Sequence, residues 1–159
     1  MDRLTYLPPG NELGVCVPVN SIVGRSSIAS VGLIGIVAYS AGLSLRFAVE
    51  WVDPDLVQKA AEPWLPFGRR GRQFLKLGAR FADGQVFTNV DGNIARTLGL
   101  PTGLREDLIW WVPRIPTQGG IELFCEWPIA NIATSKLELD GADVRRAAAT
   151  PPIQWTAPA

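Results

Sequence analysis

The stretch Leu43-Ser44-Leu45-Arg46-Phe47-Ala48-Val49-Glu50-Trp51 alternates large apolar residues with small or polar ones over its whole length. Side chains of a β-strand point alternately to the two faces of a sheet, so a period of two indicates a strand with one buried face and leaves little room for a helix. We therefore predict a strand over residues 43–51. Its core face carries Leu43, Leu45, Phe47, Val49 and Trp51. Its solvent face carries Ser44, Arg46, Ala48 and Glu50.

Short segments of the same kind recur on both sides of this strand. We predict further strands over residues 13–19, 28–39, 74–82, 85–90, 108–112, 121–127, 134–140 and 152–155. Pro18 lacks an N–H donor, which predicts an edge strand or a strand end at that point. Asp83-Gly84 predicts a tight hairpin turn, because both residues tolerate a positive φ. Residues 91–106 are expected to form a long loop, or a loop with one helical turn.

One helix is predicted near the C-terminus. Asp140 or Gly141 can cap the segment ADVRRAAAT, Asp143 lies in its first turn, and Pro151 stops it. A second short helix is compatible with residues 56–62. These elements predict a single all-β domain over residues 1–159, a two-sheet antiparallel β-sandwich of about seven to nine strands with one short C-terminal helix.

The composition indicates a globular protein without an overall electrostatic preference. The chain is 47% hydrophobic and 19% charged, with 15 basic and 15 acidic residues. A net charge of zero supplies no general attraction for nucleic acid or an anionic membrane, and it makes self-association easier. We therefore expect a protein partner or a second copy of the chain, and neither nucleic acid nor membrane.

One uncharged segment has the length of a membrane crossing. Residues 26–45 contain 20 consecutive residues without a charge. This segment holds five Ser and three Gly, and Ser40-Ala41-Gly42 is typical of a turn, so a buried hairpin is the favoured interpretation. The first residues lack the pattern of a secretory signal. The expected location is therefore the cytoplasm.

The absence of histidine restricts the chemistry of the chain. It excludes Ser-His-Asp and Cys-His catalysis and every His-ligated metal, whereas chemistry based on Lys, Tyr or carboxylates stays open. Cys16 and Cys125 form neither a CxxC pair nor a four-thiolate site. The alternation places Cys125 on the apolar face of its strand and Cys16 on the face opposite to the valines of its strand. The two side chains are therefore not expected to meet, which predicts two free thiols. We expect a protein that is not an enzyme and that has no cofactor and no metal.

Two groups of acidic residues have a structural and a functional interpretation. Glu122 and Glu126 lie about 13 Å apart along one strand, too far for the paired carboxylates of a glycosidase, and a solvated strand face is favoured. Asp53 with Asp55, and Asp91 with Asn93, could serve as calcium ligands at one end of a sandwich. The same spacing makes good turns, and no complete EF-hand pattern is present, so turns are favoured.

One basic cluster stands out in the sequence. Arg69, Arg70 and Arg72, with Lys76 close by, follow two aromatic residues and could hold phosphate or a single-stranded nucleic acid. The neutral charge of the whole chain favours a solvated loop instead.

Several aromatic residues do not fit the burial pattern, and they provide the leading functional hypothesis. The candidate binding residues are Trp110, Trp111, Phe124 and Phe74. Trp110 and Trp111 are consecutive, so one of them must leave the core face, while Phe74 and Phe124 share faces with charged residues. A covering loop or helix, or a second subunit, would bury them.

We hypothesise a non-enzymatic interaction or structural module that acts through protein–protein contacts and self-associates as a homodimer. The alternative is a β-sandwich that binds a small ligand or carbohydrate by stacking on exposed tryptophans.

The order of several sequence pieces resembles a family of uncharacterised bacterial proteins, found mostly in high-GC Gram-positive bacteria. The pieces are the valine-rich stretch before Arg25, VGLIGIVAYSAGLSLRF, PFGRRG, LGARFADGQVFTN, a tryptophan pair, FCEWP, TSKLELDG and IQW. They extend over roughly residues 13–155. The resemblance implies a β-sandwich and a cytoplasmic location, and it transfers no site residues. The chain departs from that family in having few Gly or Pro between Asn93 and Trp110, where a low-complexity insert is expected.

Overall fold

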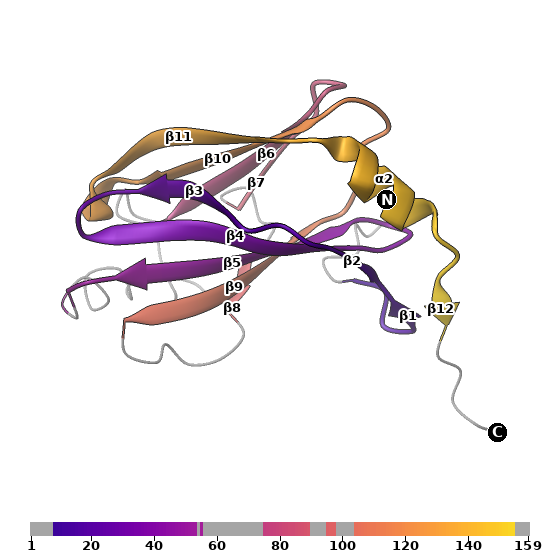
Figure 1. The fold of residues 1–159 in the computed structure, drawn as a ribbon, viewed down its shortest axis with the longest axis horizontal. Coiled ribbons are helices and arrows are strands. Elements are labelled where there is room, and N and C mark those ends of the chain that lie inside the picture. Colours follow the sequence, from indigo (N-terminus) through magenta and orange to yellow (C-terminus); the bar gives the residue numbers. More distant parts are fainter. Residues whose placement is uncertain (1–7, 54, 56–74, 90–94, 98–103, 155–159) are drawn as a thin grey trace, which may run out of the picture.

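The computed structural model describes residues 8–53, 55, 75–89, 95–97 and 104–154, which form two antiparallel sheets packed face to face (Figure 1). The larger sheet has six strands, with the order β2-β4-β5-β9-β8 and with β3 also paired to β4. These strands are β2 (Val15–Val17), β3 (Ser21–Arg25), β4 (Ala29–Ala38), β5 (Leu43–Trp51), β9 (Arg105–Val112) and β8 (Ala95–Thr97). The smaller sheet has the order β11-β10-β6-β7. Its strands are β11 (Ile132–Leu139), β10 (Ile121–Trp127), β6 (Lys76–Phe81) and β7 (Val86–Thr88).

Three smaller elements complete the described part of the chain. The 3-10 helix η2 (Pro128–Ala130) joins β10 to β11, and the helix α2 (Gly141–Ala149) follows β11. Strands β1 (Glu12–Leu13) and β12 (Ile153–Gln154) pair with each other and form a two-stranded ribbon. The predicted fold class, a two-sheet β-sandwich with one short C-terminal helix, is confirmed.

Strand β5 has the bounds and the core face that its alternation predicts. Its five inward side chains are buried in one hydrophobic cluster that extends over both sheets. The prediction for its other face is only half right. Arg46 and Glu50 are exposed, but Ser44 and Ala48 are buried. Small side chains on a sheet face lie below their larger neighbours, and Trp111 is the cross-strand partner of Ser44.

The long uncharged segment forms the β4–β5 hairpin. Its turn lies where Ser40-Ala41-Gly42 predicted it, and the Tyr39 N–H donates a hydrogen bond to the Gly42 carbonyl oxygen at 2.9 Å. No helix in the described part of the chain is long and apolar enough to cross a membrane.

Two short strands share one edge of β4. Strand β2 pairs with the second half of β4 and ends directly before Pro18, as predicted, and β3 pairs with the first half. A bulge between Ile22 and Gly24 turns β3 toward the smaller sheet, where it contacts β11. There the Ser135 hydroxyl donates a hydrogen bond to the Val23 carbonyl oxygen at 2.7 Å. The two sheets are therefore joined along this side.

The predicted hairpin and helix termini are confirmed. Gly84 has a φ of 86° in the turn between β6 and β7, and the Asp83 carboxylate accepts a hydrogen bond from the Gln85 N–H at 3.0 Å. The Asp140 carboxylate accepts a hydrogen bond from the Ala142 N–H at 2.9 Å and so caps α2.

The strand count was underestimated at three places. The segment predicted as one strand over residues 13–19 forms two strands, β1 and β2, which pair with different partners. Strand β3 was not predicted, and residues 95–97, expected to belong to a loop, form β8, which pairs with β9 through Ala95 and Trp110. Three residues are too few to show a period of two, so only the pairing with β9 defines this strand.

Candidate functional site

The two consecutive tryptophans do not form a stacking site. Trp110 is enclosed in the core between the sheets. Trp111 points to the outer face of the larger sheet, where it is also buried and packs edge-on against Tyr39 with 5.7 Å between ring centroids. Gly42 admits this packing, because a Cβ at that position would lie 2.7 Å from the Trp111 ring. The hypothesis that a ligand stacks on Trp110 or Trp111 is therefore wrong. All four tryptophans in the described residues are buried.

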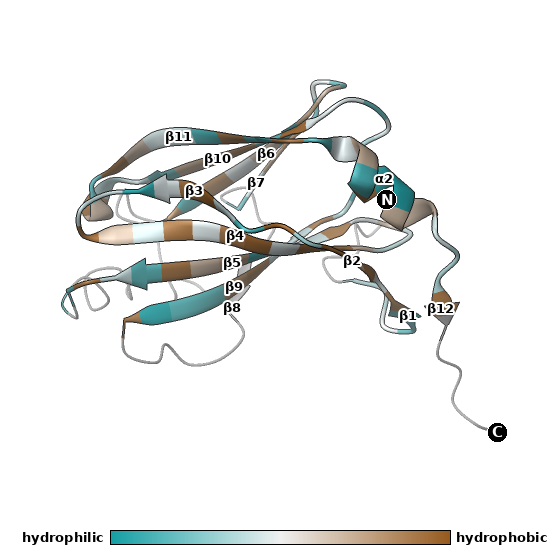
Figure 2. Cartoon of the chain, viewed as in Figure 1, coloured by the Kyte–Doolittle hydropathy of each residue, from teal (hydrophilic) through white to brown (hydrophobic). Residues whose placement is uncertain are grey.

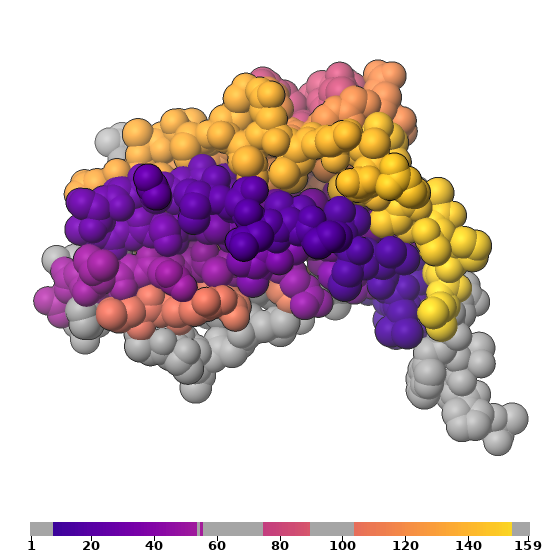
Figure 3. Space-filling model, viewed as in Figure 1, coloured from indigo at the N-terminus to yellow at the C-terminus, as the bar shows by residue number. Residues whose placement is uncertain are grey.

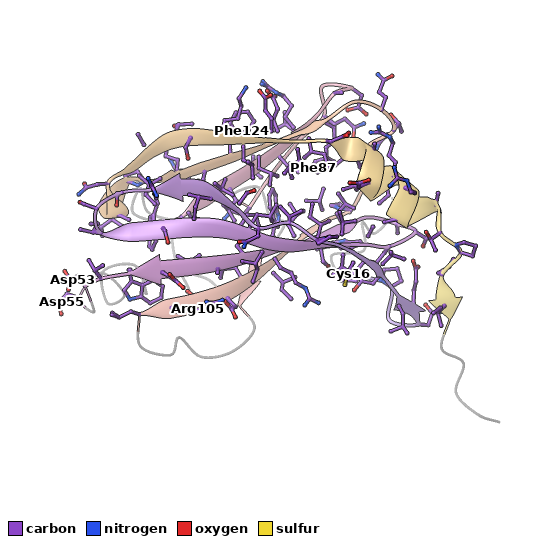
Figure 4. All side chains as sticks on the ribbon, viewed as in Figure 1. Cys16, Asp53, Asp55, Phe87, Arg105 and Phe124 are labelled. Atoms are coloured by element: carbon purple, nitrogen blue, oxygen red, sulfur yellow. The ribbon has the colours of Figure 1, made fainter. Side chains whose placement is uncertain are left out.

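Phe124 lies on the outer face of the smaller sheet, far from Trp111. Figure 4 shows it on the opposite side of the sandwich from Arg105, which belongs to the larger sheet. The Arg80 guanidinium lies over its ring at 5.1 Å from the centroid, and Gly78 is the cross-strand partner of Phe124 on β6. A cation over an aromatic face is a favourable arrangement in a partly exposed position. The position of Phe124 on a face with charged residues is thus explained within the chain, and the structure does not bring Phe124 together with Trp110 and Trp111.

The acidic residues beside Phe124 take part in cross-strand ion pairs. Glu122 pairs with Arg80 and with Lys136, and these two cations lower the pKa of its carboxyl group. Hydrogen bonds to Glu138 and Glu122 raise the pKa of Lys136. Glu126 pairs with Lys76 at 3.3 Å. The interpretation of Glu122 and Glu126 as a solvated strand face agrees with these contacts.

Several predicted site residues lie outside the described residues. They are Phe74, Arg69, Arg70 and Arg72, as well as Asp91, Asn93 and the helix proposed over residues 56–62. Asp55 is helical, and the Asp53 carboxylate accepts a hydrogen bond from the Asp55 N–H at 2.9 Å, the contact that an N-cap makes. In the part of the chain that is described, no group of three or more Cys, Asp or Glu residues is placed to hold a metal ion.

The two cysteines are free thiols, as predicted. Cys16 is exposed on β2, whereas Cys125 is buried in the core. Burial disfavours the thiolate and raises the pKa of Cys125 to about 12, and the nearby Glu126 acts in the same direction.

A hollow at one end of the larger sheet was not predicted from the sequence. It has a volume of about 420 Å³ and lies between the β3–β4 turn and the ends of β5 and β9. Four of its lining residues, Arg25, Ser30, Glu50 and Arg105, are consecutive cross-strand partners on β3, β4, β5 and β9. Directly opposed residues point to the same face, so these four side chains form one row. No local sequence signal could reveal this row, because the pairing of four strands creates it.

One wall of the hollow is an ion-paired cluster. Arg105 donates to the Glu50 carboxylate at 3.2 Å and to the Asp107 carboxylate at 3.0 Å. The opposite wall carries Arg25, which has no ion-pair partner among the described residues. Trp51 also borders the hollow, but its ring belongs to the core face of β5, where its Nε1 is buried without a hydrogen-bond partner among the described residues.

The β3–β4 turn that forms the floor of the hollow is held in place by Ser26. Its hydroxyl donates to the Ala130 carbonyl oxygen at 2.6 Å and accepts a hydrogen bond from the Ala29 N–H at 3.2 Å. The next residue, Ser27, is exposed and lines the hollow. The turn is therefore anchored to η2, the connection between β10 and β11, while its tip stays accessible.

The β1–β12 ribbon presents the second distinctive surface. It stands out from the sandwich beside α2 (Figures 1 and 3). Leu13 and Ile153 are directly opposed on it and are 62% and 69% exposed. The preceding residue, Glu12, accepts hydrogen bonds from the N–H and the hydroxyl of Ser40, each at 2.6 Å. Because neighbouring residues on a strand point to opposite sides, the Glu12 side of the ribbon faces the domain and the apolar pair faces away.

Fold and site together describe a β-sandwich with a hollow of mixed polar and apolar lining at one end and a partly apolar ribbon at the other. Comparison of the chain with protein-family models, with curated proteins and with solved structures finds no match.

Proposed function

We propose that this chain is a non-enzymatic interaction module that acts through protein–protein contacts, and that it self-associates through the β1–β12 ribbon. The observation that carries the proposal is the pair Leu13 and Ile153, two large apolar side chains that are exposed side by side on a protruding element. Figure 2 shows the brown of an apolar residue on β12, which consists of Ile153 and Gln154. Adjacent exposed apolar side chains on such an element are typical of an interaction surface.

A second copy of the chain fits this surface for three reasons. A two-stranded ribbon has two unpaired edges, which can extend into a larger sheet with another strand. In a twofold dimer the same patch meets itself, so the apolar pair would be covered by an apolar pair. The net charge of zero leaves little repulsion between copies. Because the apolar pair is small compared with a standard interface, we expect weak and concentration-dependent association.

The other parts of the proposal are supported by the composition of the chain, by its ion pairs and by its free thiols. The non-enzymatic role is supported by the absence of histidine and by the ion pairs of Glu122 and Glu126. The neutral charge supports partners other than nucleic acid or membrane. Two free thiols support a cytoplasmic location. A relationship to the bacterial family of uncharacterised proteins is also proposed, on its motifs alone.

The experiment is sedimentation or light scattering over a range of protein concentrations up to the millimolar range. We expect reversible dimerisation of the natural chain and monomers of the double variant Leu13→Ser with Ile153→Ser. The matched control is Val52→Ser with Val86→Ser, which removes two side chains that are 63% and 60% exposed at other places. A natural chain that stays monomeric at every concentration, or a ribbon variant that dimerises like the control, contradicts the proposal.

A further inference from the structure

The row of side chains above the hollow separates two opposite charges. Arg25 and Glu50 both pair with Ser30, one on each side, so their Cα atoms lie two strand spacings or about 10 Å apart. Ser30 is small and leaves the space between the two long side chains open. The hollow is therefore bordered by a cation on β3 and by a carboxylate on β5.

The charges on the two walls do not cancel locally. Arg105 is shared between Glu50, which lines the hollow, and Asp107, which does not, so the wall formed by β5 and β9 carries an ion pair within the hollow. Arg25 supplies one positive charge on the opposite wall. A ligand that complements both walls carries an anionic group at one end and a hydrogen-bond donor at the other.

Several polar groups around the hollow are available to such a ligand. The guanidinium of Arg25 has five N–H donors in a geometry that suits a carboxylate. The hydroxyls of Ser27 and Ser30 take part in none of the hydrogen bonds among the described residues. Arg105 contacts Oε1 of Glu50, so Oε2 can accept a hydrogen bond.

We propose that the hollow binds a small carboxylate that also carries a hydroxyl or ammonium donor, that is, a hydroxy acid or an amino acid. Arg25 holds the carboxylate, and the free oxygen of Glu50 accepts the donor of the ligand. A multiply charged anion such as phosphate fits less well, because the Glu50 carboxylate repels it and only Arg25 carries a cation without an ion-pair partner among the described residues. This inference is independent of self-association, since the hollow and the ribbon share no residue.

The test is a titration of the ¹⁵N-labelled full chain, followed by amide chemical shifts at constant pH and ionic strength. The four probes are acetate, glycolate, glycine and inorganic phosphate, each taken to about 100 mM because molecules of this size bind weakly. We expect saturable shifts at the amides of Arg25, Ser27 and Ser30 with glycolate or glycine. Acetate and phosphate should bind less tightly, since acetate lacks the donor and phosphate carries excess charge.

The decisive variant is Arg25→Gln, which removes the cation without breaking an ion pair. We expect about tenfold weaker binding or its loss, the size of effect typical for a hydrogen bond to a charged group. The matched control is Arg46→Gln, an exposed arginine on the same sheet face but outside the hollow, which should leave the affinity within about twofold. The inference is overturned if none of the probes gives saturable shifts at the hollow, if phosphate or acetate binds most tightly, or if Arg25→Gln binds like the natural chain.

Discussion

The hydroxyl of Ser135 donates a hydrogen bond to the carbonyl oxygen of Val23 at 2.7 Å, across 112 positions of the sequence. Ser135 belongs to the smaller sheet and Val23 to the larger one, so this contact joins the sheets at the edge where β3 meets β11.

Replacement of Ser135 by Ala should lower the free energy of unfolding by about 1–2 kcal/mol, because the partly buried carbonyl of Val23 loses its partner. Chemical denaturation measures the change. Thr134→Ala is the control, since among the described residues its exposed side chain makes only one hydrogen bond, to Glu126 at 3.3 Å. Equal stability of the two variants would show that the Ser135 contact contributes nothing to the joining of the sheets.

Gly24→Ala tests how closely the sheets approach each other. An added Cβ would lie 2.8 Å from the Ser135 hydroxyl oxygen and 3.0 Å from the Cys125 sulfur. Overpacking of this kind should cost about 1–3 kcal/mol of unfolding free energy. Gly35→Ala is the matched control, because a Cβ there meets nothing within 4 Å. A Gly24→Ala protein as stable as the control would mean that β3 and β11 lie farther apart.

The two thiols should differ sharply in reactivity. Cys16 is exposed and should react with a maleimide in the folded protein, whereas the buried Cys125 should react only after unfolding. Mass spectrometry should therefore count one adduct on the native chain and two on the denatured chain. Cys16→Ser should leave the native protein unlabelled, and labelling of that variant under native conditions would place Cys125 at the surface.

Burial of Cys125 should make the protein less stable in alkaline solution. Its pKa is raised to about 12 in the folded state from 9.0, the ordinary value. Above pH 9 the unfolded chain releases the Cys125 thiol proton while the folded chain retains it. The contribution of this thiol to the unfolding free energy is therefore fully present below pH 9 and is lost as the pH rises toward 12. One such proton changes the unfolding free energy by up to about 1.4 kcal/mol per pH unit.

The measurement is a series of denaturation curves between pH 8 and pH 11, compared with Cys125→Ala. The variant is expected to be less stable at neutral pH, since it leaves a small cavity, but its stability should fall less steeply above pH 9. Parallel curves for the two proteins would exclude Cys125 as the source of the slope.

The sequence by itself determined the elements whose signals are local. The period of two in residues 43–51 gave the bounds and the core face of β5, because one buried face imposes that period on the side chains. Asp83-Gly84 and the Asp140 cap defined a hairpin and a helix start through backbone conformations and hydrogen bonds that involve only neighbouring residues. The alternation of β10 likewise predicted which of its side chains are buried.

Only the tertiary structure decided what covers each face and which strands meet. Alternation predicts that Trp110 and Trp111 point in opposite directions, but the packing of Trp111 against Tyr39 buries the second ring as well. The contact between Ser135 and Val23 and the row formed by Arg25 and Glu50 depend on residues far apart in the chain. Such neighbours are set by the register of several strands at once, and a one-dimensional pattern contains no information about them.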